Sequence, residues 1–141
     1  MPETVINVRT VHGASTAIGW SGARAVTIDR PIEAGGLGLG YNGGELLLLA
    51  IGACYTNDLY REAAKRDITI WSVALEVRCD WGGDPVRAQN VRFSPTVVGE
   101  ASETELEALI AHTDRVAEVH NSLRLGTPVA LVSPRAVPVA R

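Results

Sequence analysis

A single thiol lies where an apolar stretch of the chain gives way to a polar one. Cys54 follows the run LLLLAIGA, which begins at Leu46. On a helix, the residues beyond this point that share a face with the thiol are polar: Asn57, Asp58 and Arg61. A nucleophilic thiol suits such a boundary, because it must be ionised to react and so needs a nearby cation or a helix N-terminus. We therefore take Cys54 as a candidate nucleophile, with Asp58 and Arg61 as candidate supporting residues.

The same residues are also compatible with an inert core cysteine. Cys54 lies about three turns into the expected helix, beyond the first turn in which the helix dipole acts. Ionisation would therefore depend on side chains. Arg61, about two turns away, is the local cation, whereas the carboxylate of Asp58, about one turn away, would raise the pKa of the thiol. The local sequence leaves both interpretations open.

The remaining histidine and cysteine candidates are expected to be structural. His120 falls on the inward face of the second predicted helix, where a buried, hydrogen-bonded ring is favoured over a direct partner for Cys54, although that encounter is geometrically possible. Cys79 alternates with polar residues on a predicted strand and is interpreted as a small core side chain. No CxxC motif or Cys/His cluster with metal-ligand spacing occurs. We expect no metal site.

Composition limits the class of protein. The chain has 141 residues, which suggests a single domain spanning residues 1–141, and 46% of them are hydrophobic. A net charge of −3 with scattered Lys and Arg gives no basic surface for nucleic acid. The longest apolar run, residues 46–51, is too short to cross a membrane. Because the N-terminus carries no export signal, we expect a cytoplasmic protein with reduced cysteines.

One glycine-rich stretch matches the GxGxxG pattern of dinucleotide-binding proteins. It spans residues 38–43, but no strand ends at its first glycine, and the acidic residue about 20 positions on lies inside the next helix. The context therefore does not fit, and we expect no bound nucleotide or other cofactor. A loop that allows the backbone to pass close to a neighbouring chain is the simpler interpretation.

The chain is predicted to fold in the order of strands, helix, hairpin, helix and strand. Alternating residues predict strands over 4–11 and 24–29, with a further strand near 16–20. After a loop, Asn42 and Glu45 form a capping box that begins a helix over about 43–66. Its first half is apolar all round and must be wrapped by a sheet or by a second subunit, whereas its second half is amphipathic and should emerge into solvent.

The C-terminal half of the chain is predicted in the same way. Residues 71–81 alternate regularly and should form a hairpin with 87–99. Ser102 and Glu105 form a second capping box, which begins a helix that should end at Gly126. Residues 127–133 should then form a last strand, followed by a tail over 134–141. Because strands and helices do not alternate regularly, the fold class is α+β.

The segment from Glu45 to Cys54, the strand WSVALEVRCDW and the later stretch TDRVAEVHNSLRLGTPVALV resemble the OsmC/Ohr family. The resemblance implies an OsmC-like fold and an intertwined homodimer, in which both chains contribute to sheets that wrap two central helices. Family members with known activity reduce organic hydroperoxides and act in oxidative-stress defence. They use a cysteine on the central helix, a second cysteine on the second helix and an arginine from the N-terminal strands. Cys54 matches the first cysteine.

The other positions depart from the family pattern, so the chain resembles a divergent member that lacks the second cysteine. Where the family has Cys-Pro-Val-Ser, this chain reads Ala-Glu-Val-His at positions 117–120. No arginine lies between Arg9 and Arg24, and Gly44 occupies the position of the glutamate that pairs with the family arginine. An external thiol would therefore have to reduce an oxidised Cys54, with Arg24, Arg61 or the other subunit as the cation.

Three hypotheses follow from the resemblance and the residues together. The first is thiol-dependent reduction of small organic hydroperoxides at Cys54 alone, with Arg61, Asp58 and His120 as possible supporting residues. The alternative is a non-catalytic binder that holds a small apolar ligand in the cleft between subunits. The third is a purely structural protein with no pocket.

Overall fold

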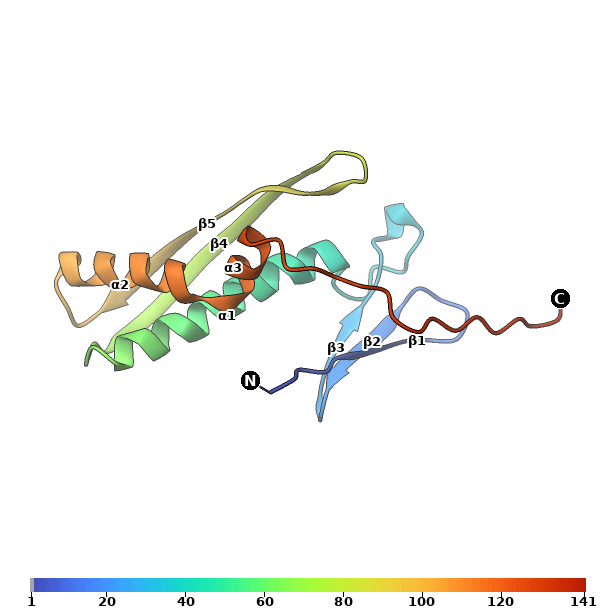
Figure 1. Cartoon of the computed structure of the whole chain (residues 1–141), viewed down its shortest axis with the longest axis horizontal. Coiled ribbons are helices and arrows are strands. Elements are labelled where there is room, and N and C mark those ends of the chain that lie inside the picture. The colour runs from blue at the N-terminus through green and yellow to red at the C-terminus, as the bar shows by residue number, and fades with distance from the viewer. Residues whose placement is uncertain (1) are drawn as a thin grey trace.

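The protein is described by a computed structural model that covers residues 2–141. Figure 1 shows two parts, a small N-terminal sheet and a larger layer of helices beside a long hairpin. The elements in chain order are β1 (Asn7–Thr10), β2 (Ala17–Ser21), β3 (Arg24–Ile28), the short helix η1 (Ile32–Ala34), α1 (Gly43–Ala64), β4 (Ile70–Gly82), β5 (Arg87–Gly99), α2 (Glu103–Val116) and α3 (Glu118–Arg124). The predicted α+β class is confirmed.

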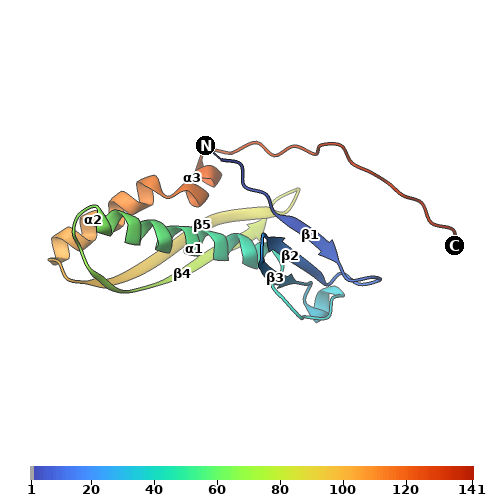
Figure 2. The same cartoon turned by 90° about the horizontal axis from the view of Figure 1, so that it is seen from below.

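The N-terminal sheet is antiparallel, with strand order β1-β2-β3. Asn7 is opposite Trp20 in the first pair of strands, and Ala17 is opposite Ile28 in the second. All three predicted strands are present, and at least one end of each lies within two residues of its expected position. Figure 2 shows this sheet beyond the N-terminal end of α1, away from the middle of the hairpin.

The loop between β3 and α1 is held by the buried carboxylate of Asp29. Asp29 Oδ2 accepts hydrogen bonds from Thr16 Oγ1 at 2.9 Å and from the backbone amides of Leu37 and Leu39 at 3.3 and 3.2 Å. A bridge between Ile28 and Tyr41 then brings the chain back beside β3. These contacts fix the point from which α1 begins.

Both predicted capping boxes are present. At the start of α1, the Glu45 amide donates to Asn42 Oδ1 at 2.8 Å, and the Asn42 amide donates to Glu45 Oε1 at 3.0 Å. Ser102 and Glu105 make the equivalent pair of bonds at the start of α2. Each box satisfies backbone donors that a helix N-terminus otherwise leaves free.

The larger layer is built on the β4–β5 hairpin, whose strands pair antiparallel from Ile70 opposite Gly99 to Gly82 opposite Arg87. The predicted hairpin is confirmed. Helix α1 packs against β4, and α2 packs against both α1 and β5. The buried residues at the centre of this layer are Tyr55, Leu59, Ala63, Leu109 and Ala117.

Two expectations, for the second helix and for the C-terminal segment, are wrong. The second predicted helix is two helices, because Ala117 adopts an extended conformation (φ −66°, ψ 130°) that ends α2 and precedes α3. Residues 127–133 form no strand in this chain, since no neighbouring strand lies beside them. The second half of α1 is amphipathic, as predicted, with one face buried against α2, α3 and the hairpin and the other exposed at Tyr60, Arg61 and Ala64.

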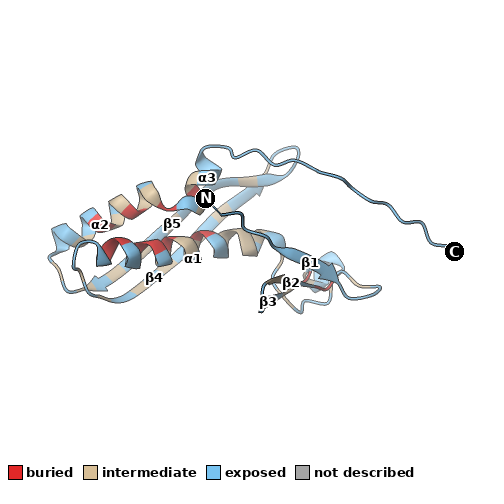
Figure 3. Cartoon of the chain, turned by 60° about the horizontal axis from the view of Figure 1, so that its bottom comes forward, coloured by how far each residue is buried: buried red, intermediate tan, exposed pale blue. Residues whose placement is uncertain are grey.

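The apolar first half of α1 is covered less than its second half. Leu49 is 50% exposed, whereas Tyr55 and Leu59 are fully buried. Figure 3 shows the buried residues of α1 gathered in the part of the helix that faces α2. The chain by itself therefore does not enclose the segment that its sequence predicts to be enclosed.

Candidate functional site

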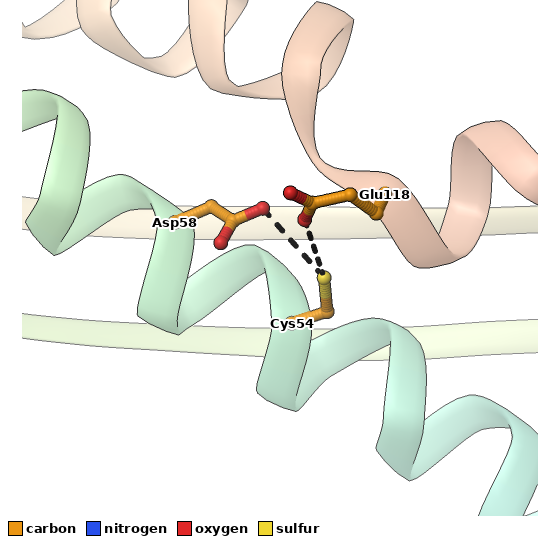
Figure 4. A group of neighbouring side chains, drawn as sticks. All are labelled: Cys54, Asp58 and Glu118. Atoms are coloured by element: carbon orange, nitrogen blue, oxygen red, sulfur yellow. Dashed lines mark hydrogen bonds between the residues drawn. The ribbon is translucent and has the colours of Figure 1, made fainter. Parts of the chain in front are cut away.

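The thiol of Cys54 meets two carboxylates where α1 passes the start of α3. Cys54 Sγ lies 3.6 Å from Asp58 Oδ2, one turn along the same helix. It also lies 3.6 Å from Glu118 Oε2 on α3, which is 64 residues away in the sequence. Figure 4 shows both carboxylates directed toward the sulfur atom. The site therefore joins the predicted pair of Cys54 and Asp58 to a residue that the sequence did not single out.

The break between α2 and α3 is what brings Glu118 to the thiol. Ala117 is buried and extended, so the chain turns there and Glu118 becomes the first residue of α3. The turn also brings the backbone amides of Glu118 and Val119 within hydrogen-bond reach of the sulfur. A continuous helix, as the sequence predicts, would have given Glu118 a different direction. No Gly or Pro marks this break, which is why sequence analysis missed it.

Burial raises the pKa of the Cys54 thiol, and the negative charge of Asp58 raises it further. The amides of Val119 and Glu118 act in the opposite direction, because they would donate to a thiolate, but they do not outweigh burial. The resting thiol is therefore protonated at neutral pH.

The two carboxylates beside the thiol differ in their affinity for a proton. Burial raises the pKa of Asp58, and the adjacent Glu118 carboxylate raises it further. A hydrogen bond with Asp58 lowers the pKa of Glu118. Of the pair, Asp58 therefore binds a proton more tightly, and Glu118 is the carboxylate that stays ionised to lower pH.

Arg61 lies beside the carboxylates and makes no hydrogen bond to the sulfur among the described residues. Its Nη1 atom is 3.2 Å from Asp58 Oδ1 and 3.5 Å from Glu118 Oε1. Its Nε atom is 3.2 Å from Glu62 Oε2. Arg61 therefore balances the charge of the carboxylates, and its effect on Cys54 passes through them.

Glu62 anchors this charge network from the buried side of α1. Its carboxylate lies 2.7 Å from Lys65 Nζ and 2.7 Å from His112 Nε2, in addition to its contact with Arg61. Lys65 and His112 together hold the pKa of Glu62 at about 2. The contact with His112 joins α2 to α1.

His120 is buried and hydrogen-bonded, as the sequence favours. Its Nε2 atom lies 2.8 Å from the backbone oxygen of Asp114, and its ring packs 5.2 Å from the ring of Phe93. No hydrogen bond joins His120 to Cys54 in the part of the chain that the structure describes. Arg24 lies in the N-terminal sheet at the start of β3, and Cys79 lies on β4, so neither belongs to the Cys54 cluster.

A comparison with protein-family models shows to which family the chain belongs. A family model described as OsmC-like protein matches residues 35–132, which include α1, the hairpin, α2 and α3. The chain belongs to the OsmC family. No curated protein matches the chain at significant similarity.

Solved structures of OsmC-like proteins share the fold at low sequence identity. An OsmC-like protein from Mycoplasma pneumoniae is 20% identical, with a TM-score of 0.76 over 87% of this chain and 88% of its own. A stress-response protein from Psychrobacter arcticus is also 20% identical, with a TM-score of 0.73 over 86% and 89%. An organic hydroperoxide resistance protein from Legionella pneumophila is 19% identical, with a TM-score of 0.66 over 88% and 90%. The predicted OsmC-like fold is confirmed.

The donor atoms of the OsmC-family cluster are close enough to hold a cation. One atom each from Cys54, Asp58 and Glu118 lies within 4.8 Å of the others. The sequence predicted no metal site, because it contains no CxxC motif and no Cys/His cluster with metal-ligand spacing. Since the guanidinium of Arg61 already lies against both carboxylates, charge balance here needs no metal ion.

Two apolar hollows flank the exposed first half of α1. One, of about 520 Å³, lies between α1 and β4, and its lining includes Leu48, Gly52, Ala53, Leu75 and Val77. The other, of about 540 Å³, lies between α1 and the N-terminal sheet, and its lining includes Ile6, Val8, Trp20, Leu46 and Ala50. Among residues 2–141, no helix is long and apolar enough to cross a membrane.

Proposed function

We propose that this OsmC-family protein reduces organic hydroperoxides at Cys54 in a one-cysteine cycle. The observation that carries the proposal is the position of the thiol, 3.6 Å from each of two carboxylates, Asp58 and Glu118, either of which can relay its proton. Structural neighbours named as organic hydroperoxide resistance proteins support this choice of substrate. The proposed role is in defence against oxidative stress.

The first step transfers two electrons from sulfur to the peroxide. Glu118 accepts the thiol proton, and the thiolate attacks the terminal peroxide oxygen of ROOH. The S–O bond forms as the O–O bond breaks, and the proton taken up by Glu118 passes to the departing alkoxide. The products are the Cys54 sulfenic acid and the alcohol ROH. The general base is necessary because the raised pKa keeps the resting thiol protonated.

The second half of the cycle needs two equivalents of an external thiol. Ala117 stands where the family's second cysteine is expected, so the chain offers no thiol of its own at this place. The first external thiol condenses with the sulfenic acid to form a mixed disulfide and water. The second attacks that disulfide, which restores the Cys54 thiol and releases the oxidised reductant as a disulfide.

The working unit is proposed to be a homodimer. Apolar side chains are exposed on three separate segments: Val8 on β1 is 60% exposed, Leu49 on α1 is 50% exposed and Leu131 in the C-terminal segment is 88% exposed. Figure 2 shows the C-terminal segment running away from its own helices. A second copy that covers these segments would provide the enclosure that the first half of α1 lacks.

A binding function is the second candidate, and the electrostatics of Cys54 favour it. A thiol with a raised pKa and two acidic neighbours is a poor resting nucleophile. The hollow of about 520 Å³ beside α1 is large enough for a small apolar ligand. In this alternative, Cys54 has no redox role.

Oxidation by one equivalent of cumene hydroperoxide separates the two candidates. Mass spectrometry after trapping with dimedone should find a sulfenic adduct on Cys54, and Cys54→Ser should abolish thiol-dependent peroxide consumption. Cys79→Ser is the matched control and should retain activity. Glu118→Gln should lower the rate about 100-fold if Glu118 is the general base. An unmodified Cys54 in the treated protein would reject the peroxidase and leave the binder.

A further inference from the structure

The break between α2 and α3 changes the partner of one backbone amide. In a continuous helix, the backbone oxygen of Asp114 would accept a hydrogen bond from the amide of Glu118, four residues further on. The extended conformation of Ala117 interrupts this pattern, and the Glu118 amide instead lies within hydrogen-bond reach of Cys54 Sγ. The Asp114 oxygen, in the last turn of α2, therefore needs other donors.

Three side chains of α3 donate to the Asp114 oxygen in place of that amide. His120 Nε2 lies 2.8 Å from this oxygen, Asn121 Nδ2 lies 3.0 Å from it and Arg124 Nη1 lies 3.2 Å from it. A carbonyl oxygen can only accept, so all three nitrogens act as donors here. Because all three belong to α3, these bonds tie α3 to the end of α2 across the break.

Two of these side chains make further bonds at the break. Asn121 Nδ2 also donates to the backbone oxygen of Ala117 at 2.8 Å, so one amide group binds both sides of the break. Arg124 Nη2 binds the carboxylate of Asp114 at 2.8 Å, and Arg124 Nη1 lies 3.2 Å from Asn121 Oδ1. A planar guanidinium with several acceptors fixes direction as well as distance. Asn121 and Arg124, which we call the clasp, therefore hold α3 in one orientation relative to α2.

The clasp does not touch the thiol. Among the described residues, no hydrogen bond joins Asn121 or Arg124 to Cys54 or to the side chain of Glu118. Glu118 is the first residue of α3 and is 64 residues from Cys54 in the sequence, so no local contact keeps the two side chains 3.6 Å apart. The orientation of α3 is what places the carboxylate beside the sulfur.

We propose that Asn121 and Arg124 are positioning residues for the Cys54 site, because by holding the break between α2 and α3 they keep the Glu118 carboxylate beside the thiol. The consequence for catalysis rests on the proposed function, in which Glu118 accepts the thiol proton. The placement of Glu118 by the clasp can be measured without any peroxide.

The test measures the pH midpoint for alkylation of Cys54 by iodoacetamide in the full-length protein carrying Cys79→Ser. Glu118→Gln should move this midpoint to lower pH, because it removes a negative charge beside the thiol. In a background of Asn121→Ala and Arg124→Gln, the same substitution should move the midpoint by less than about half as much, because the carboxylate has already left the thiol. Equal shifts in the two backgrounds would overturn the proposal.

Arg115→Gln is the matched control for the clasp. Arg115 is an exposed arginine of α2 that makes no hydrogen bond or ion pair among the described residues. In that background, Glu118→Gln should shift the midpoint as it does in the wild type. A shift reduced there as well would mean that any lost arginine charge has the same effect, and the clasp would be rejected. If the double variant fails to fold, Arg124→Gln alone decides by the same comparison, because its side chain is half exposed.

Cumene hydroperoxide separates this proposal from the proposed function. At neutral pH, Cys54 in the Asn121→Ala, Arg124→Gln protein should be oxidised about 10- to 100-fold more slowly than in the wild type, because the general base is displaced. The loss should shrink as the pH rises beyond the thiol pKa, since an ionised thiol needs no base. A loss of equal size at every pH would contradict the positioning role. A wild-type Cys54 that the peroxide leaves unmodified would reject the proposed function, and the alkylation midpoints would still decide whether the clasp holds Glu118.

Discussion

The two halves of α1 differ in a way that their compositions do not suggest. Residues 46–53 are almost entirely apolar, yet within this half only Ile51 is buried. The second half carries two carboxylates, Asp58 and Glu62, and both are buried beside Leu59. The second half lies against α2, α3 and the hairpin, whereas the first half projects toward the N-terminal sheet. Neighbouring elements, and not apolar content, decide which half is covered within one chain.

The buried charges of the second half are tolerated because each has a partner of opposite charge. Asp58 pairs with Arg61, and Glu62 pairs with Arg61 and Lys65 and also lies 2.7 Å from His112 Nε2. A buried carboxylate without such partners would be strongly destabilising. Residues 46–53 have no charged group to pair, and they have an apolar surface that water does not favour. The contrast supports our proposal that a second copy covers the first half.

The largest effect is expected from a cavity in the second half. Leu59→Ala should lower the free energy of unfolding by about 2–5 kcal/mol, because the side chain is fully buried and its neighbours collapse only partly. Denaturant unfolding monitored by circular dichroism measures this change. Leu49→Ala is the control in the first half and should cost less at low protein concentration. If Leu49→Ala lowers the free energy of unfolding as much as Leu59→Ala does at low protein concentration, the core is not confined to the second half of α1.

A charge in the first half should act on assembly instead. Leu49→Lys introduces an ammonium into the surface that a second copy is proposed to cover, so sedimentation velocity should show a shift from dimer to monomer. Tyr60→Lys is the matched control, because Tyr60 is similarly exposed, at 45%, but lies on the second half. A wild-type protein that is monomeric and folded at micromolar concentration would reject the proposed dimer altogether.

Sequence reasoning succeeded where the cause of a structure is local. The capping boxes at Asn42 and Ser102 need only residues within one turn, and the strand β4 follows from its own alternation. It failed where the cause is distant. The strand predicted over 127–133 requires a neighbour that this chain does not supply, and the break at Ala117 follows from tertiary packing without a Gly or Pro to mark it.

The same distinction between local and distant causes applies to the residues of the candidate site. Cys54, Asp58 and Arg61 were predicted together because they are spaced for one face of a helix, and the structure brings Asp58 close to both of the others. Glu118 was missed because its approach depends on the break before α3. The departure from the family pattern at positions 117–120 was the one available signal, and it indicated a missing thiol without indicating that a carboxylate would face Cys54.

The smallest effect concerns the pH dependence of the second half. The pKa of Glu62 is about 2 in the folded chain, against an ordinary value of 4.5, so its ionised form is bound more tightly by Lys65 and His112 than by water. A depressed folded pKa contributes stability above the unfolded value, and this contribution is lost as the pH falls from about 4.5 to about 2. The difference in unfolding free energy between wild type and Glu62→Gln should therefore shrink over this interval, measured by urea unfolding at successive pH values. Glu107→Gln, in an exposed position of α2, is the control and should change little. If the difference in unfolding free energy between wild type and Glu62→Gln stays constant down to pH 2, the charge of Glu62 does not contribute to stability. Ion pairing would then not explain why the second half of α1 tolerates its buried carboxylates.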